Sequence, residues 1–201
     1  MKFLETLEDL HALYGTPGPA AMRKVARQLT PLYRKWIEAS RLCVLTTVGP
    51  EGTDGSPRGD DGPVVQIVDE RTLLLPDWSG NNRIDSLRNI LRDGRVSLMF
   101  MVPGSNNVIR VNGTAKITAD AGLLNQFETR GKHPRTVVVI TILEVYSQCA
   151  RALMRARFWT SGDESEGLPT VGDLLQENTD GEIVGKEYDS DWGVRAEKTM
   201  W

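Results

Sequence analysis

The sequence has few of the residues that build covalent or metal-bound frameworks. Its 201 residues include two cysteines, Cys43 and Cys149, and two histidines, His11 and His133. Two cysteines make neither a disulfide framework nor a metal-ligand cluster, so we expect two free thiols in a reducing compartment, the cytoplasm. Neither histidine lies near a motif, and we expect both to be structural. No metal site is predicted.

Long apolar runs and an excess of one charge are also missing. No stretch approaches the roughly 20 apolar residues of a membrane-spanning helix, and the acidic, amphipathic start lacks the profile of a secretory signal. The net charge is −3, from 24 basic and 27 acidic residues, which argues against a general nucleic-acid-binding protein. Residues 161–201 carry 11 acidic and 3 basic residues, which leaves a mildly basic body. This asymmetry indicates that the body binds an anion.

Hydrophobic periodicity predicts helices first and then mostly strands. Residues 1–40 contain two helical regions, Phe3 to Tyr14 and Pro19 to Ser40, and Thr30-Pro31 inside the second predicts a capped restart. The acidic tail contains one short helical candidate, Val171 to Gln176. We therefore divide the chain into an N-terminal helical segment (1–40), a central domain (41–160) and an acidic C-terminal tail (161–201).

The central region predicts six strands with one helix packed between the two halves. Residues 49–62, rich in glycine and proline, are expected to form a long turn. The expected strands are Leu42 to Val48, Val64 to Val68, Thr72 to Leu75, Arg95 to Val102, Val108 to Thr118 and Val137 to Tyr146. Cys149 to Trp159 returns to helical spacing. The fold class is therefore mainly β with flanking helices (α+β), arranged as a closed or split antiparallel β-barrel.

The segment Thr72 to Phe100 is the most informative part of the chain. Gly80-Asn81 supplies a break and a side-chain cap for a helix, and an apolar face follows at helical spacing: Ile84, Leu87, Ile90 and Leu91. Arg83 is expected to project on the buried side of this helix. A cation in the first turn opposes the helix dipole, so a bound phosphate would explain both features. The alternative is an arginine that buries its stem and whose head reaches water.

Two further loci have an open interpretation. The first is the glycine-containing loop SPRGD, in which Arg58 offers a planar fork for phosphate; alternatively the loop is only structural and Asp60 pairs with Arg58. The second is Arg151 and Arg155, which share a helix face. These two residues could equally form a solvated basic face beside the acidic tail.

The order and spacing of these motifs resemble a known family. SPRGD, then TLLLPDWSGNNRIDSLRNIL, GRVSLMF, IRVNGTAKI and CARAL are similar to the pyridoxamine 5′-phosphate oxidase-related FMN-binding split-barrel family, from about Leu42 to Trp159. The closest resemblance is to the bacterial branch with SPRGD and GNNR signatures, not to the true oxidases. It implies a homodimer that binds two FMN molecules at the subunit interface. The tail lacks the Trp/Arg-rich segment that helps true oxidases bind substrate, so vitamin B6 oxidation is not expected.

The resemblance also implies which residues bind the cofactor. Arg58 and Arg83 would bind the phosphate, with Asp60, Asn81 and Asn82 close by. The flavin would be lined by the strand residues Val64, Val65 and Gln66, where Gln66 replaces a lysine, and by Pro76 and Asp77. Arg110 falls where a glutamine usually contacts the ring. The partner chain would add Ser147, Gln148 and Arg151. No catalytic residue is assigned.

The leading functional hypothesis is an FMN-dependent oxidoreductase acting on an unidentified small molecule. A flavin carries the reacting group itself, so the protein needs only to position and tune it. One alternative is a flavin-binding carrier or sensor without turnover. Another is the same barrel with deazaflavin F420 or haem, for which Cys149 is the nearest axial candidate. The last is an empty pocket that serves only dimer contacts.

Overall fold

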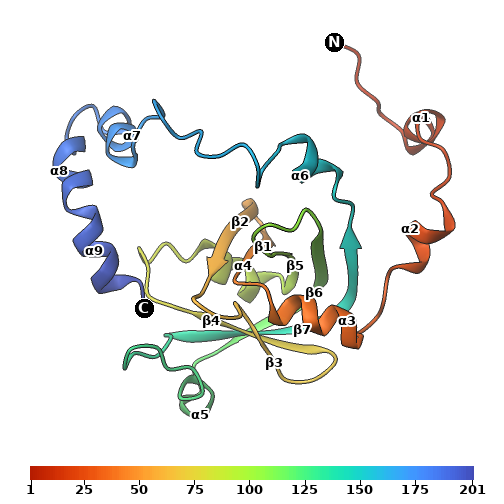
Figure 1. The fold of residues 1–201 in the computed structure, drawn as a ribbon, viewed down its shortest axis with the longest axis horizontal. Helices are drawn as coiled ribbons and strands as arrows, with labels where there is room; N and C mark the ends of the chain where they lie inside the picture. The colour runs from red at the N-terminus through yellow and green to blue at the C-terminus, as the bar shows by residue number, and fades with distance from the viewer.

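The computed structural model describes all 201 residues, and its centre is a seven-stranded antiparallel sheet with short helices around it (Figure 1). The order across the sheet is β2-β1-β5-β6-β7-β4-β3. The strands are β1 (Leu42–Gly49), β2 (Gly52–Gly59), β3 (Gln66–Ile67), β4 (Thr72–Asp77), β5 (Arg95–Met101), β6 (Val108–Thr118) and β7 (Thr136–Gln148). The predicted fold class, an α+β protein built on an antiparallel split barrel, is confirmed.

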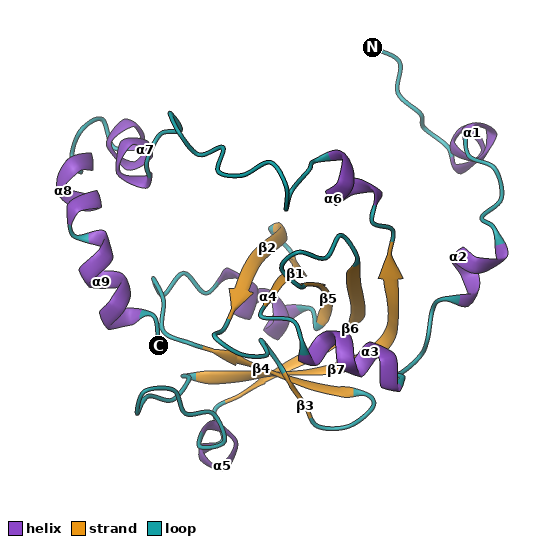
Figure 2. Ribbon diagram, in the orientation of Figure 1, coloured by secondary structure: helices purple, strands orange, loops and turns teal.

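The helices are short and lie before, within and after the sheet (Figure 2). The Thr30 hydroxyl accepts a hydrogen bond from the Tyr33 backbone N–H, and Pro31 is the first helical residue, so the predicted restart is confirmed. None of the helices has the length and apolar character needed to cross a membrane. Their bounds are α1 (Leu7–Leu13), α2 (Pro19–Arg23), α3 (Pro31–Glu38), α4 (Asp85–Arg92), α5 (Ala121–Leu124), α6 (Arg151–Arg155), α7 (Val171–Asn178), α8 (Gly185–Ser190) and α9 (Trp192–Thr199).

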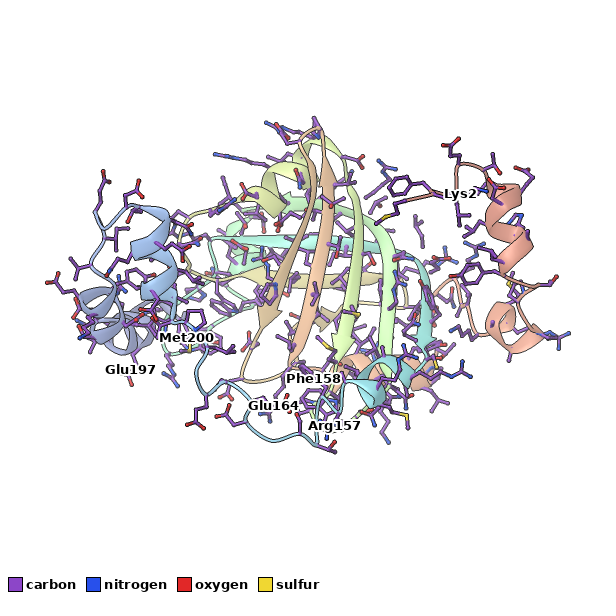
Figure 3. The ribbon with its side chains drawn as sticks, turned by 90° about the horizontal axis from the view of Figure 1, so that it is seen from above. Lys2, Arg157, Phe158, Glu164, Glu197 and Met200 are labelled. Atoms are coloured by element: carbon purple, nitrogen blue, oxygen red, sulfur yellow. The ribbon has the colours of Figure 1, made fainter.

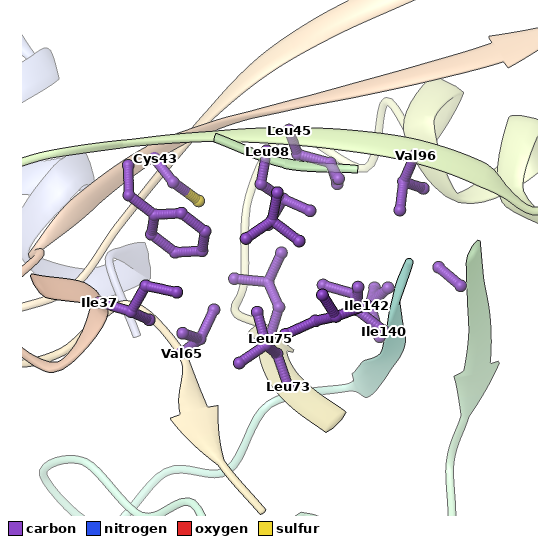
Figure 4. Packing of buried hydrophobic residues seen from close by; sticks show 14 of the residues in the cluster. Ile37, Cys43, Leu45, Val65, Leu73, Leu75, Val96, Leu98, Ile140 and Ile142 are labelled. Carbon is purple, nitrogen blue, oxygen red and sulfur yellow. The ribbon is translucent and has the colours of Figure 1, made fainter. Parts of the chain in front are cut away.

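The core lies inside the curved sheet and joins strands from both of its halves. Leu45 and Leu98, from the paired strands β1 and β5, face Leu73 of β4 and Ile140 of β7, and Ile37 of α3 closes one end (Figure 4). Alternate residues of β1 are buried, as expected for a strand with one face on a core. This shared core brings β2, at one edge of the sheet, towards β4, the second strand from the other edge, and the candidate site lies there.

Three expectations about the elements were wrong. Residues 49–62 are not one long turn, because they contain β2, which pairs with β1 along its whole length. The strand expected at Val64 to Val68 is limited to β3, because only Gln66 and Ile67 pair with β4. Val64 and Val65 come before β3 in the chain and are buried. The acidic tail contains three helices, α7 to α9, rather than one. In β2 the backbone pairing with β1 outweighs the poor strand propensity of glycine and proline.

Candidate functional site

Two adjoining cavities lie where the end of β2 meets β4 and the loop that leads to α4. The larger has a volume of about 570 Å³ and the smaller a volume of about 360 Å³. Four residues line both: Pro57, Arg58, Trp78 and Gly80. A single elongated molecule can therefore extend from one cavity into the other.

The smaller cavity gathers most of the polar residues predicted to bind phosphate. It is lined by Arg58, Asp77, Asn81, Asn82 and Arg83. Arg58 forms an ion pair with Asp77, which links the ends of β2 and β4. The predicted convergence of the SPRGD loop and the Asn81–Arg83 turn on one place is therefore present in the structure.

The smaller cavity also contains two residues that the sequence did not suggest. β4 pairs with β7 in an antiparallel register that sets Asp77 opposite Thr136, and this brings Arg135 to the cavity. Arg135 Nη1 donates a hydrogen bond to Asn82 Oδ1 at 2.6 Å. Strands about 60 residues apart leave no local sequence pattern that shows how they pair. Only the register of β7 against β4 could therefore have placed Arg135 and Thr136 in the cavity.

Two buried polar atoms of this cavity lack a hydrogen-bond partner. They are Arg58 Nε and Thr136 Oγ1, and both residues line the cavity wall. Buried polar atoms in native proteins are almost always paired, and leaving one unpaired costs about 1–3 kcal/mol. Arg58 Nε–H and the Thr136 hydroxyl are donors, so an anion in the cavity could accept from both once the two side chains turn towards it. The arrangement therefore fits a phosphate group.

The expectation that Arg83 projects on the buried side of a helix is wrong. Its side chain is 79% exposed, and its Nε donates to Asp85 Oδ2 at 2.5 Å. This hydrogen bond raises the pKa of Arg83, so the guanidinium stays charged. Helix α4 begins two residues later, at Asp85, so Arg83 still belongs to the preceding turn. The alternative interpretation is right that the guanidinium reaches water, but the 79% exposure shows that the stem is not buried either.

The expected cap and apolar face of this helix also need correction. Asn81 Oδ1 accepts from the Arg83 backbone N–H at 2.9 Å, within a turn, and the helix has no side-chain cap. Asn82 adopts a left-handed backbone conformation with φ 61°, which Asn tolerates better than most residues. Of the expected apolar face, Ile90 is buried, whereas Ile84 and Leu91 are exposed.

The larger cavity has an aromatic wall. Trp78 and Trp201 meet edge to face, with ring centroids 5.5 Å apart and an interplanar angle of 87°. Trp78 Nε1 donates to Asp60 Oδ2 at 2.9 Å. If the SPRGD loop were only structural, Asp60 was expected to pair with Arg58, but it pairs with this indole instead. The predicted residues Val64 and Pro76 line the same cavity. Neither tryptophan was expected in the site.

Val65 and Gln66 line neither of these two cavities. They line a third hollow of about 370 Å³, which shares Asp60 and Pro76 with the larger cavity. The Val65 side chain is buried in the core and the Gln66 side chain is exposed on β3. Their predicted contact with a flavin remains a prediction.

The remaining four predicted residues lie elsewhere on the barrel. Arg110 stacks over the Tyr146 ring, with Cζ 5.3 Å from its centroid. Ser147 and Gln148 end β7, and Arg151 opens α6 on the surface. None of the four lines either cavity. The role of the last three in a neighbouring subunit concerns a contact between two chains and stays a prediction.

A buried thiol lies under the polar end of the site. Cys43 is opposite Arg58 in the β1–β2 register. Burial raises the pKa of the Cys43 thiol to about 12, although the nearby Arg58 charge acts in the opposite direction. Cys43 is therefore a neutral core residue, whereas Cys149 is exposed.

Comparison with known proteins gives one family. The sequence model of the pyridoxamine 5′-phosphate oxidase family matches residues 29–149, more than half of the chain. No curated protein matches the sequence.

Several solved structures resemble the chain. HupZ of Group A Streptococcus shares 18% identity, covering 59% of this chain and 93% of that protein, with a TM-score of 0.49. An FMN-binding protein of Syntrophomonas wolfei shares 15% identity, covering 58% and 88%, with a TM-score of 0.43. General Stress Protein 26 of Bacillus anthracis shares 20% identity, covering 57% and 88%, with a TM-score of 0.40.

Proposed function

The chain belongs to the pyridoxamine 5′-phosphate oxidase family, and from this premise we propose that it binds FMN and acts as an oxidoreductase on a small molecule. The observation that carries the proposal is the polar end of the smaller cavity. Arg58 Nε and Thr136 Oγ1 are buried there without partners, beside two further guanidinium groups, those of Arg83 and Arg135. Donors and positive charge together favour a phosphate dianion.

The shape of the site supports a ligand longer than phosphate. With a phosphate group in the smaller cavity, the rest of the molecule would extend past Arg58 into the larger one, whose lining includes Val64, Pro76 and Trp78. Apolar and aromatic side chains next to a few polar groups are typical of cofactor sites. The ion pair of Arg58 with Asp77 would fix the guanidinium at the junction.

When bound, FMN would supply the ring that accepts and returns a hydride equivalent. The protein would supply binding, orientation and exclusion of water. The chain offers no group of three His, Cys, Asp or Glu side chains arranged for a metal ion. Asp60, which accepts a hydrogen bond from the Trp78 indole, lines the larger cavity and could orient a substrate there.

We further propose that the working form is a homodimer. Ser147, Gln148 and Arg151 would then approach the cofactor of the neighbouring subunit. Met154 and Phe158, close to Arg151 in sequence, are 59% and 57% exposed, and burying such side chains favours association. Light scattering coupled to size-exclusion chromatography should give twice the chain mass; a monomer that still holds flavin contradicts this arrangement.

The visible spectrum of the purified protein tests the cofactor directly. We expect flavin absorption bands and, after denaturation, release of FMN identified by mass. Protein that is colourless and binds no added FMN would refute the proposal. Photoreduced flavin that re-oxidises rapidly, together with turnover of NADH or NADPH, would support an oxidoreductase. A tightly held but inert flavin would instead support the carrier or sensor.

A further inference from the structure

The acidic tail forms a small helical unit of its own beside the barrel. Helices α7 and α8 pack so closely that a side chain at Gly172 would overlap the Gly185 backbone. Asp189 joins them, because it accepts from the Thr170 hydroxyl and from the Gly172 backbone N–H at 2.9 Å. Figure 3 shows this unit to one side of the barrel, with Glu164 on the connecting segment and Met200 at the end that faces the barrel. The contacts of Asp189 and the two glycines therefore hold α7 and α8 together as one unit.

The end of the tail reaches the barrel at the larger cavity. Met200 and Trp201 line that cavity, and Trp201 packs against Trp78. Close by, Lys132 Nζ donates to the Lys198 carbonyl oxygen at 2.7 Å. Lys132 lines neither the larger nor the smaller cavity, so it holds the tail without touching the contents of either.

The two indoles of the aromatic wall differ in their hydrogen bonding. Trp78 Nε1 donates to Asp60. Trp201 Nε1 is buried and has no partner. An N–H excluded from water without an acceptor destabilises the state that buries it. The docked position of the tail therefore leaves one donor without an acceptor, and a small rotation of the indole towards a molecule in the cavity would supply one.

We propose that residues 170–201 form a lid over the larger cavity and that Trp201 is the residue through which a bound molecule closes it. The inference rests on the proposed function, since the molecule is the flavin whose phosphate lies in the smaller cavity. The ligand class is a planar conjugated ring with a carbonyl or ring-nitrogen acceptor at its edge. Such a ring fits beside two perpendicular indoles and accepts from Trp201 Nε1.

The coupling between lid and ligand has a fixed direction. A ligand shifts a conformational equilibrium only by its differential affinity for the two states. Here the hydrogen bond from Trp201 exists only when the tail is docked. Binding therefore favours closure, and by reciprocity any change that weakens closure also weakens binding.

The test uses the full-length protein, stripped of flavin and titrated with FMN by calorimetry. Trp201→Phe keeps an aromatic ring but removes the N–H, and we expect it to weaken FMN binding by roughly 3–10-fold, the effect of one lost hydrogen bond. Trp192→Phe is the matched control, because Trp192 is exposed on α9 and lines neither cavity. Its affinity should equal that of the wild type.

Trypsin cleavage after Arg195 and Lys198 reports the position of the lid. FMN should slow this cleavage in the wild type but have little effect on Trp201→Phe. Lys132→Met removes the second tether, so it should speed cleavage and also weaken FMN binding, although Lys132 is outside the cavities.

The outcomes separate the two proposals. A wild-type protein that binds no FMN overturns the proposed function, and the lid with it. Wild-type binding combined with unchanged affinity of Trp201→Phe overturns the lid alone. An FMN-independent rate of tail cleavage in the wild type also overturns the lid alone.

Discussion

The ion pair of Arg58 with Asp77 makes the most direct prediction, because its two members should affect FMN binding differently. Arg58→Met removes a phosphate ligand, whereas Asp77→Asn removes a negative charge that competes with phosphate for the same guanidinium. Both substitutions remove the charge pairing between β2 and β4 in the folded protein. Stability and binding should therefore separate.

The cost to stability follows from the burial of the pair. Side-chain exposure is 22% for Arg58 and 15% for Asp77. Removing one member of a fully buried pair costs about 3–5 kcal/mol, and an exposed pair contributes about 0–1 kcal/mol. For this mostly buried pair we expect each substitution to lower the free energy of unfolding by about 1–3 kcal/mol in urea titrations.

Binding should then distinguish the two variants. A charge-assisted hydrogen bond contributes about 1.5–3 kcal/mol, so Arg58→Met should weaken FMN binding by about 10–100-fold in calorimetry. Asp77→Asn should bind FMN as tightly as the wild type or more tightly. Arg95→Met is the control, because Arg95 is exposed on β5 and pairs only locally with Asp93. Wild-type affinity in Arg58→Met, or a loss confined to Asp77→Asn, would refute this account of the site.

Three other predictions concern separate parts of the chain. Arg83→Ala should weaken FMN binding by about tenfold while leaving urea stability nearly unchanged, because the side chain is exposed; equal affinity in calorimetry would remove Arg83 from the site. Folded protein should present one reactive thiol to a disulfide reagent at pH 8, that of Cys149, and unfolded protein two. Burial raises the pKa of Cys43 from 9.0 to about 12, so the unfolded state loses its proton first and stability should fall as pH rises through this range. Gly113→Ala should cost about 1–3 kcal/mol of stability, because its Cβ would overlap the Thr141 carbonyl oxygen, whereas Gly55→Ala, with open space around it, should be nearly neutral.

Local sequence patterns predicted the regular parts of the fold well. The alternation in Leu42–Gly49 and the cap-and-proline pair at Thr30-Pro31 depend on neighbouring residues only, and both elements formed as expected. β2 could not be found in this way, because its glycines and proline favour a turn. It exists because β1 offers it a complete set of backbone partners, and such pairing leaves no trace in the composition of the strand.

The same distinction applies to the candidate site. Arg58, Asn82 and Arg83 were found because they lie in short motifs of recognisable composition. Arg135, Thr136 and Trp201 were missed because they come to the cavities through the β4–β7 register and the path of the tail. A residue that reaches a site only through long-range pairing has ordinary local surroundings in the sequence.

Arg83 shows how a correct location can follow from an incorrect reason. Its expected inward direction assumed helical geometry, in which each residue turns by about 100°. Helix α4 begins at Asp85, so that rotation does not apply to residue 83, and the left-handed Asn82 sets its direction instead. Arg83 nevertheless lines the smaller cavity, because the turn itself closes one side of it. The proposed anion site would therefore depend on the shape of the Asn81–Arg83 turn rather than on the helix dipole. Replacing Asn82 with a β-branched residue, which resists positive φ, should disturb phosphate binding more than any change on the exposed face of α4.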